Sequence, residues 1–249
     1  MRKVERVYAR LMGSAFADAK AGLGGKLFYA GELDDDGRAL IVAANIAGAA
    51  TLVATTDRTA QKRAVRDGIA DFLVNSLDES LRILKNQLRR REAVAVCVGL
   101  AREGVEREME ERGVLPDLKR RDLTTAPWHD AVLIWEDAQE EVDFSKTPAL
   151  VSWRVNSGLP KDLAKLDAIA LECLDADDWR ARRWLNLAPR YLGRLSDGLR
   201  LLDCNREYAA RLIEHVRECV ERGDIAVAVE ICSHFRGQRA EYRFVPGKS

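Results

Sequence analysis

The sequence predicts an α/β fold, in which a Rossmann-like parallel sheet is followed by an additional α+β C-terminal part. Up to Thr124, short apolar runs alternate with helical patterns of roughly 10–15 residues, as in successive βαβ units. Residues 93–98, AVAVCV, are continuously apolar, which is typical of a strand buried on both faces. After Thr124 the regular alternation ends, and strands and helices follow in a different order.

The elements of the first half follow from their apolar spacing. An amphipathic helix is predicted over 4–20, ended by the glycine-rich residues 21–25. Asp57 is a predicted N-cap, and Ser76 with Glu79 forms a capping box. Strands are predicted at 26–30, 51–54, 71–74 and 93–98, with a strand or extended loop at 115–118, and helices at 39–49, 58–68, 77–90 and 103–112.

The second half is predicted to mix strands with longer helices. Strands are predicted at 131–135, 149–155 and 199–203, helices at 161–174, 177–187 and 206–222, and a hairpin from the strands 225–232 and 241–245. The helix over 177–187 is expected to stop near Pro189, because proline breaks a helix interior. A polar, acidic stretch at 139–146 sets the boundary between domain 1–140 and the C-terminal part 147–249.

Composition restricts the partners and the compartment. Lysine and arginine number 40, and so do aspartate and glutamate, so no net charge draws the chain to nucleic acid or to an anionic membrane. No apolar run approaches the roughly 20 residues that span a bilayer. The five cysteines are widely spaced and lie mostly in apolar runs, which predicts a reduced, cytoplasmic protein. No clustered Cys and His spacing indicates a metal site.

The turn after the first predicted strand is the candidate ligand loop. Gly31 and Gly37 either admit a diphosphate close to the backbone or shape a plain tight turn. Between them lie acidic residues, including Asp34, Asp35 and Asp36, which would repel a diphosphate at about 1 kcal/mol per like-charge pair at ~4 Å in water. The run suits a divalent cation or a helix N-terminus, and the latter interpretation is favoured. Asp57 lies where such folds hold a ribose hydroxyl, or caps the next helix.

With these elements placed, residues 26–130 resemble the nucleotide-binding region of urocanate hydratase (urocanase). The resemblance rests on segments in the family's order: 30–31 with 46–49, 53–57, 66–68 with 77–81, and RGVLPDL at 112–118 followed by Asp122, TTA at 124–126 and His129-Asp130. It implies a Rossmann-like fold and an NAD cofactor that acts as an electrophile in the hydration of urocanate. Thr125 and His129 become candidate cofactor-binding residues, although a turn threonine and a surface histidine are the commoner readings.

The departures from the family pattern shape the functional hypothesis. The glycine-rich diphosphate turn is replaced by acidic residues, the chain is less than half the usual enzyme length, and no catalytic residue is assigned. The sequence therefore predicts a urocanase-like protein without hydratase activity, with a small-molecule or nucleotide site at the carboxyl ends of the strands. The alternatives are an NAD- or nucleotide-dependent lyase or hydratase with a remodelled phosphate loop, and an assembly protein.

Assembly is suggested by the distribution of aromatic residues. All five tryptophans lie from Trp128 onward, and large aromatics are enriched at interface cores. A homodimer built by the C-terminal half, with Trp179 or Trp184 at its interface, is one expectation. Packing of the tryptophans in the core is the other.

Overall fold

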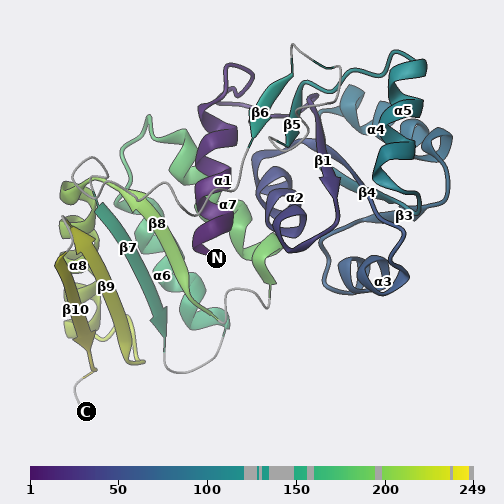
Figure 1. Cartoon of the computed structure of the whole chain (residues 1–249). Helices are drawn as coiled ribbons and strands as arrows, with labels where there is room; N and C mark the ends of the chain where they lie inside the picture. Colours follow the sequence, from purple (N-terminus) through teal and green to yellow (C-terminus); the bar gives the residue numbers. More distant parts are fainter. Residues whose placement is uncertain are drawn as a thin grey trace. The chain divides into compact units, whose positions relative to one another are not determined.

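A computed structural model describes residues 1–120, 128, 131–134, 149–155, 160–193, 198–235 and 238–246. The chain divides into two compact units, Arg2–Asp137 and Ala138–Ser249, with Met1 assigned to the second. The predicted boundary segment at 139–146 lies outside the described residues. Each unit has its own sheet, and together they confirm the predicted fold class (Figure 1).

The first unit contains a parallel six-stranded sheet in the order β3-β4-β2-β1-β5-β6. Its strands are β1 (Leu27–Glu32), β2 (Ala50–Ala54), β3 (Phe72–Val74), β4 (Val94–Val98), β5 (Leu118–Arg120) and β6 (Val132–Ile134). Its helices are α1 (Arg2–Gly13), α2 (Asp35–Ala47), α3 (Arg58–Arg66), α4 (Leu77–Arg90) and α5 (Arg102–Glu111). The central strands β2 and β4 are buried along their whole length, as the continuous apolar runs predict.

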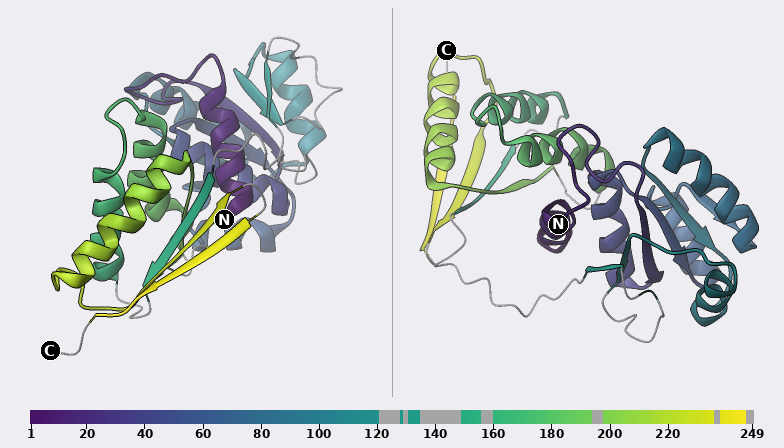
Figure 2. Two further views of the ribbon diagram at one scale, coloured as in Figure 1. Left: turned by 90° about the vertical axis from the view of Figure 1, so that its left-hand side faces the viewer. Right: turned by 90° about the horizontal axis from the view of Figure 1, so that it is seen from above.

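The order of the strands places helices on both faces of this sheet. The chain moves from β1 to β2 in one direction and returns from β4, past β2 and β1, to β5. Because parallel crossovers are right-handed, this reversal carries α4 and α5 to the face opposite α2. Figure 2 shows α1 and α2 on one side of the sheet and α4 and α5 on the other. Tyr29 and Leu52 of the sheet pack with Leu84 of α4 and Met109 of α5 in one core.

Two predicted helix boundaries in this unit are wrong, the end of the first helix and the start of the second. The predicted helix 4–20 ends as α1 at Gly13, and turns follow it. The predicted helix 39–49 begins earlier, at Asp35, because the side chain of Asp34 accepts a hydrogen bond from the Gly37 N–H and caps the helix. Its end at Gly48 has a φ of 96°, the left-handed conformation that ends many helices.

The second unit contains an antiparallel four-stranded sheet in the order β10-β9-β7-β8. Its strands are β7 (Ala149–Val155), β8 (Arg200–Cys204), β9 (Val229–Phe235) and β10 (Gln238–Phe244), and its helices are α6 (Pro160–Glu172), α7 (Trp179–Leu192) and α8 (Arg206–Glu221). The predicted C-terminal hairpin is confirmed, with Phe235 paired to Gln238, although β9 begins later than expected. The predicted stop of α7 near Pro189 is wrong, since the helix continues to Leu192.

The tryptophans of the described residues are mainly core residues. Trp153 is 1% exposed and donates its indole N–H to Asp167, and Trp184 is 3% exposed and donates to the Leu201 carbonyl at 2.7 Å. Trp128 is also buried, Trp179 is half-buried, and Trp135 lies outside the described residues. This burial favours packing in the core for Trp184, and a homodimer built by the C-terminal half stays a prediction.

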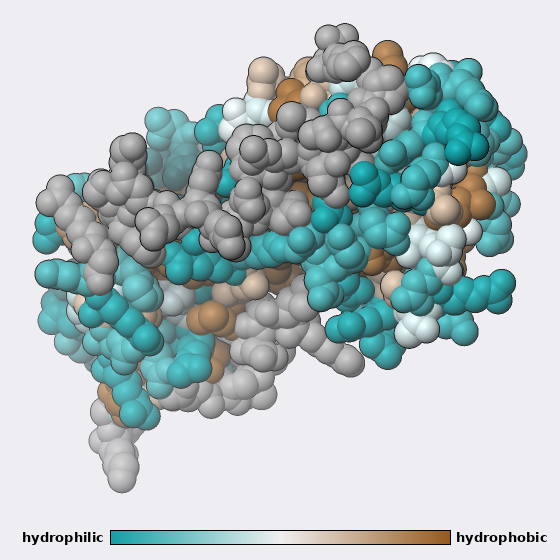
Figure 3. All heavy atoms as spheres, in the orientation of Figure 1, coloured by the Kyte–Doolittle hydropathy of each residue, from teal (hydrophilic) through white to brown (hydrophobic). Residues whose placement is uncertain are grey.

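The surface is largely hydrophilic on the face that Figure 3 draws, where hydrophobic residues appear only as small separate areas among the coloured atoms. Within the described part of the chain, no helix is long and apolar enough to cross a membrane.

Candidate functional site

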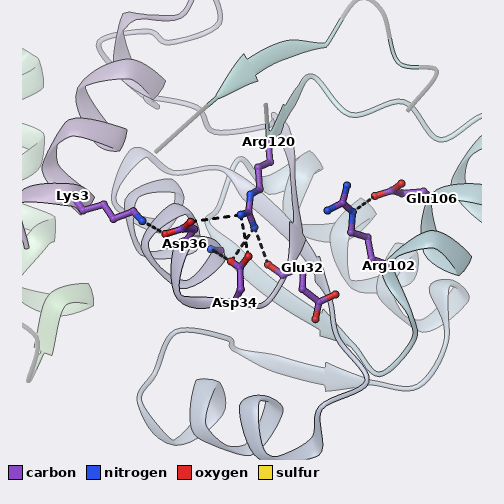
Figure 4. A network of polar contacts seen from close by, with 8 residues as sticks. Lys3, Glu32, Asp34, Asp36, Arg102, Glu106 and Arg120 are labelled. Atoms are coloured by element: carbon purple, nitrogen blue, oxygen red, sulfur yellow. Dashed lines mark hydrogen bonds and ion pairs between the residues drawn. The ribbon is translucent and has the colours of Figure 1, made fainter. Parts of the chain in front are cut away.

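The candidate site lies at the carboxyl ends of β1 and β5, where the strand order reverses. In open α/β sheets, ligands bind in the crevice that such a reversal creates. Glu32 ends β1, Asp34 and Asp36 follow it at the start of α2, and Arg120 ends β5. Figure 4 shows the carboxylates of Asp34 and Asp36 and the backbone carbonyl of Glu32 around the guanidinium of Arg120, with Lys3 of α1 beside Asp36.

Arg120 is the centre of this group. Its side chain is only 6% exposed. It donates to both carboxylate oxygens of Asp34, with Nη1–Oδ1 at 2.9 Å and Nη2–Oδ2 at 3.0 Å, the two-pronged geometry in which arginine binds a carboxylate most specifically. Nη1 also reaches the backbone carbonyl of Glu32 at 3.4 Å, and Nη2 lies 3.8 Å from an Asp36 oxygen. Arg120 thus ties the end of β5 to the start of α2.

Asp34 holds the helix end and the arginine with one carboxylate. Its Oδ1 accepts from the Gly37 N–H at 2.6 Å as well as from Arg120. Partial burial alone would raise the pKa of Asp34, but the hydrogen bonds from Arg120 and Gly37 outweigh it and lower the pKa below its ordinary value. The preferred interpretation of the acidic run, as a helix N-terminus, is confirmed for Asp34.

Two residues of the acidic run pair with cations that sequence patterns did not connect to it. Lys3 of α1 forms an ion pair with Asp36, and Arg120 pairs with Asp34. Among the described residues, no group of three or more His, Cys, Asp or Glu side chains is arranged to hold a metal ion. The divalent-cation interpretation of this run therefore has no geometric support in the part of the chain that is described.

The two glycines of the loop are required by the backbone. Gly31 has a φ of 71°, at a point where the register of β1 with β2 shifts. A Cβ on Gly37 would lie 2.2 Å from the Glu32 carbonyl oxygen, which leaves room for no side chain. The tight-turn interpretation accounts for both glycines, and their contact with a ligand stays a prediction.

A second polar cluster lies on the face of the sheet covered by α5. The Tyr29 hydroxyl donates to Glu106 Oε1 at 3.4 Å, and Arg102 Nε donates to the same oxygen at 2.8 Å. The rings of Tyr29 and Trp128 meet edge to face, 5.2 Å apart. Burial, followed by the nearby Glu106 carboxylate, raises the pKa of Tyr29, so its hydroxyl remains a donor at all ordinary pH values.

Asp57 lies three residues beyond the end of β2 and is exposed. Its Oδ1 accepts from the backbone N–H groups of Thr59 at 2.7 Å and Ala60 at 3.2 Å, which confirms the predicted N-cap of α3. Its second oxygen, Oδ2, has no hydrogen-bond partner among the described residues. The contact of Asp57 with a ribose hydroxyl stays a prediction.

The other two predicted site residues, Thr125 and His129, lie outside the described residues, as does Asp130. Their roles stay predictions. Cys97 lies within β4 and is fully buried, as expected of a small core residue. Burial, helped by the Glu32 carboxylate, raises the pKa of the Cys97 thiol to about 12.

Replacing Asp57 with alanine is expected to lower the free energy of unfolding by about 1 kcal/mol, because two helix N–H groups lose their acceptor. Urea unfolding followed by circular dichroism measures this change. Asp57→Ser is the matched control, since serine also caps and should recover most of the loss. Equal losses in both variants would contradict the capping role.

Comparison with known proteins identifies the family of the first unit. A family model of the urocanase Rossmann-like domain matches residues 5–135, which is more than half of the 249-residue chain. A search of curated proteins finds no match. The matched segment contains the parallel sheet, the Arg120–Asp34 pair and the loop with Gly31 and Gly37. The chain therefore belongs to the urocanase family, through a Rossmann-like domain that forms its N-terminal unit.

Proposed function

We propose that this chain is a urocanase-family protein that lacks urocanate hydratase activity and binds a small, hydroxyl-bearing molecule at the carboxyl ends of the neighbouring strands β2, β1 and β5. The ligand class that fits best is a nucleoside or a similar molecule without a diphosphate. The observation that carries the proposal is the Arg120–Asp34 pair at the N-terminus of α2.

A diphosphate does not fit the residues at this position. In dinucleotide-binding folds, a diphosphate accepts from the N–H groups at the start of the helix that follows the first strand. Here the Gly37 N–H already donates to Asp34, and the two-pronged face of Arg120 is engaged by the same carboxylate. An incoming diphosphate would lie beside Asp34 and Asp36, and their cationic partners Arg120 and Lys3 are already engaged and are not available to bind the phosphates.

The neighbouring carboxylates favour a ligand that donates hydrogen bonds. The Glu32 carboxylate points away from Arg120 in Figure 4, while its backbone carbonyl accepts from that arginine. Glu32 ends β1, and Asp57 with its unused Oδ2 follows β2, the adjacent strand. Two acceptors at neighbouring strand ends suit the hydroxyl groups of a ribose.

The test compares adenosine, ADP and NAD by isothermal titration calorimetry with the purified chain. The proposal predicts that adenosine binds and that adding the diphosphate in ADP or NAD weakens binding by tenfold or more, a factor that corresponds to about 1.4 kcal/mol. A dissociation constant for NAD below that for adenosine would overturn the proposal and favour the NAD-dependent enzyme.

Two loop variants show whether the Arg120–Asp34 pair or the negative charge of the loop alone weakens the binding of a diphosphate. In Asp34→Gly, Arg120 and the helix N–H groups lose their shared carboxylate, so ADP affinity should rise. Asp35→Gly removes the same charge from an exposed neighbour that is not paired with Arg120, and should leave ADP affinity nearly unchanged. Equal gains in the two variants would show that net charge, rather than the engaged arginine, opposes the diphosphate.

Urocanate hydratase activity is measured separately. The chain is incubated with urocanate and NAD, and the absorbance of urocanate is followed. No loss above the protein-free control is expected, because the chain does not hold NAD through its diphosphate. Turnover above the control would overturn the loss of hydratase activity, whatever the nucleoside titrations show.

A further inference from the structure

The surface formed by α4 and the end of α5 carries an exposed leucine beside a hollow. Figure 1 shows the two helices side by side in the first unit. Leu115, in the loop between α5 and β5, is 70% exposed, the largest exposed fraction among the large hydrophobic side chains that the structure describes. The hollow next to it has a volume of about 510 Å³ and is lined by Asp78, Leu81, Arg82, Lys85, Arg112 and Val114. Because Val114 precedes Leu115 in the chain, the leucine and the hollow are adjacent on one surface.

The backbone on both sides of Leu115 is fixed. The Val114 N–H donates to the Met109 carbonyl of α5 at 2.8 Å, and the Asp117 N–H donates to a carbonyl at the start of β1 at 3.0 Å. Pro116, which directly follows Leu115, restricts the backbone of the leucine to extended conformations. Since this loop is held in place before any partner arrives, little conformational entropy would be lost when a partner covers the leucine.

The hollow offers two basic side chains to a partner. Arg112 also lines it, but this arginine is already paired with Asp78 and with Glu108. Arg82 and Lys85 are exposed on α4, and neither forms an ion pair within the described part of the chain. An acidic group that approaches the hollow would therefore meet two cations without displacing an existing partner.

The surroundings of Leu115 have the opposite charge. Glu110 and Glu111 belong to the last turn of α5, and both are exposed and form no ion pair among the residues that the structure describes. The hydrogen bond from Val114 back to α5 keeps the leucine beside this turn. A single exposed leucine is ordinary on a protein surface. Here, however, an apolar side chain with acidic neighbours lies next to a hollow with basic walls, so the surface is complementary to itself.

We propose that a second copy of this chain covers this surface, with Leu115 of each copy inserted into the hollow of the other. Because the leucine and the hollow are adjacent, a two-fold axis between them makes both contacts at once. The same axis brings the acidic turn of α5 in each copy to the basic side chains of α4 in the other. Burial of the leucines supplies the affinity, since exposed ion pairs contribute little, and the charges fix the orientation. This interface belongs to the first unit and does not involve the tryptophans of the C-terminal half.

Sedimentation equilibrium of the full chain measures the assembly, and a monomer–dimer equilibrium in the micromolar range is expected. Leu115→Glu should raise the dissociation constant of the dimer about a hundredfold, because the dimer buries this side chain twice. Val245→Glu is the matched control, since Val245 is 63% exposed in the second unit and its replacement should leave the dimer unchanged. A native chain that stays monomeric, or a dimer that persists in Leu115→Glu, would overturn the proposal.

Reversing the charges tests how the two copies face each other. The variant with Arg82→Glu and Lys85→Glu has an acidic hollow. The variant with Glu110→Lys and Glu111→Lys has basic surroundings at Leu115. Each variant alone should dimerise about tenfold more weakly, because like charges then meet across the interface. An equimolar mixture of the two should recover the native affinity, because every contact in the mixed dimer again joins opposite charges. If the mixture dimerises no better than the separate variants, these two surfaces do not face each other and the proposed interface is wrong.

Discussion

Replacing Trp184 with alanine is expected to lower the free energy of unfolding of the second unit by about 3–5 kcal/mol. The Trp184 ring is 3% exposed, and its indole N–H donates to the Leu201 carbonyl of β8 at 2.7 Å. Truncation would leave a cavity between α7 and the sheet and would leave that carbonyl without its partner. Differential scanning calorimetry should detect a large fall in the midpoint of unfolding.

The conservative variant divides this loss into its two parts. Trp184→Phe keeps an aromatic ring but not the N–H donor, so it should lose about 1–3 kcal/mol for the unsatisfied carbonyl and the smaller ring. Light scattering on the same samples tests the interface hypothesis. A Trp184→Ala variant that keeps its unfolding midpoint and dissociates from a dimer would contradict the core position of this residue.

Local signals in the sequence were sufficient for the fold class and for several boundaries. The helix α4 has the predicted bounds, and its start follows from a capping box in which the Glu79 N–H donates to Ser76 Oγ. The start of α2 was misplaced because an aspartate run reads equally as a loop or as a cap. The order of the strands could not be predicted from local patterns, because it depends on which of several similar apolar strands pair with each other.

The candidate site was predicted only in part, for a related reason. The loop with Gly31, Gly37 and the aspartates was identified from its position after a strand. Its partner Arg120 was missed, because Asp34 and Arg120 are 86 positions apart and only the pairing of β1 with β5 brings them together. The basic pair Lys119-Arg120 after the apolar start of β5 was the available signal, but nothing local connects it to the acidic run.

Removing Arg120 is the direct test of this long-range link. Arg120→Met should lower the free energy of unfolding at neutral pH by about 1–3 kcal/mol, because Asp34 loses its partner and faces Asp36 unscreened. The loss is small because the Asp34 side chain is 45% exposed and water screens part of the charge. Urea unfolding at several pH values measures the effect.

The pH dependence of this loss has a definite sign. The pKa of Asp34 is lower in the folded chain than its ordinary value of 3.8, so the folded state favours the carboxylate. The contribution of the pair is present above pH 3.8 and is lost as the pH falls through the lowered folded pKa. The difference between the native chain and Arg120→Met should therefore be constant near neutral pH and shrink below about pH 4.

A double-mutant cycle distinguishes the pair from other effects of the methionine. Asp34→Asn keeps a side chain that caps α2 but has no charge, so Arg120→Met in that background should cost clearly less than in the native chain. A coupling energy of about 1–2 kcal/mol is expected for two charged side chains in contact. If the two substitutions are additive, Arg120 acts on the sheet independently of Asp34, and the loop would then be free to accept a diphosphate without breaking an ion pair.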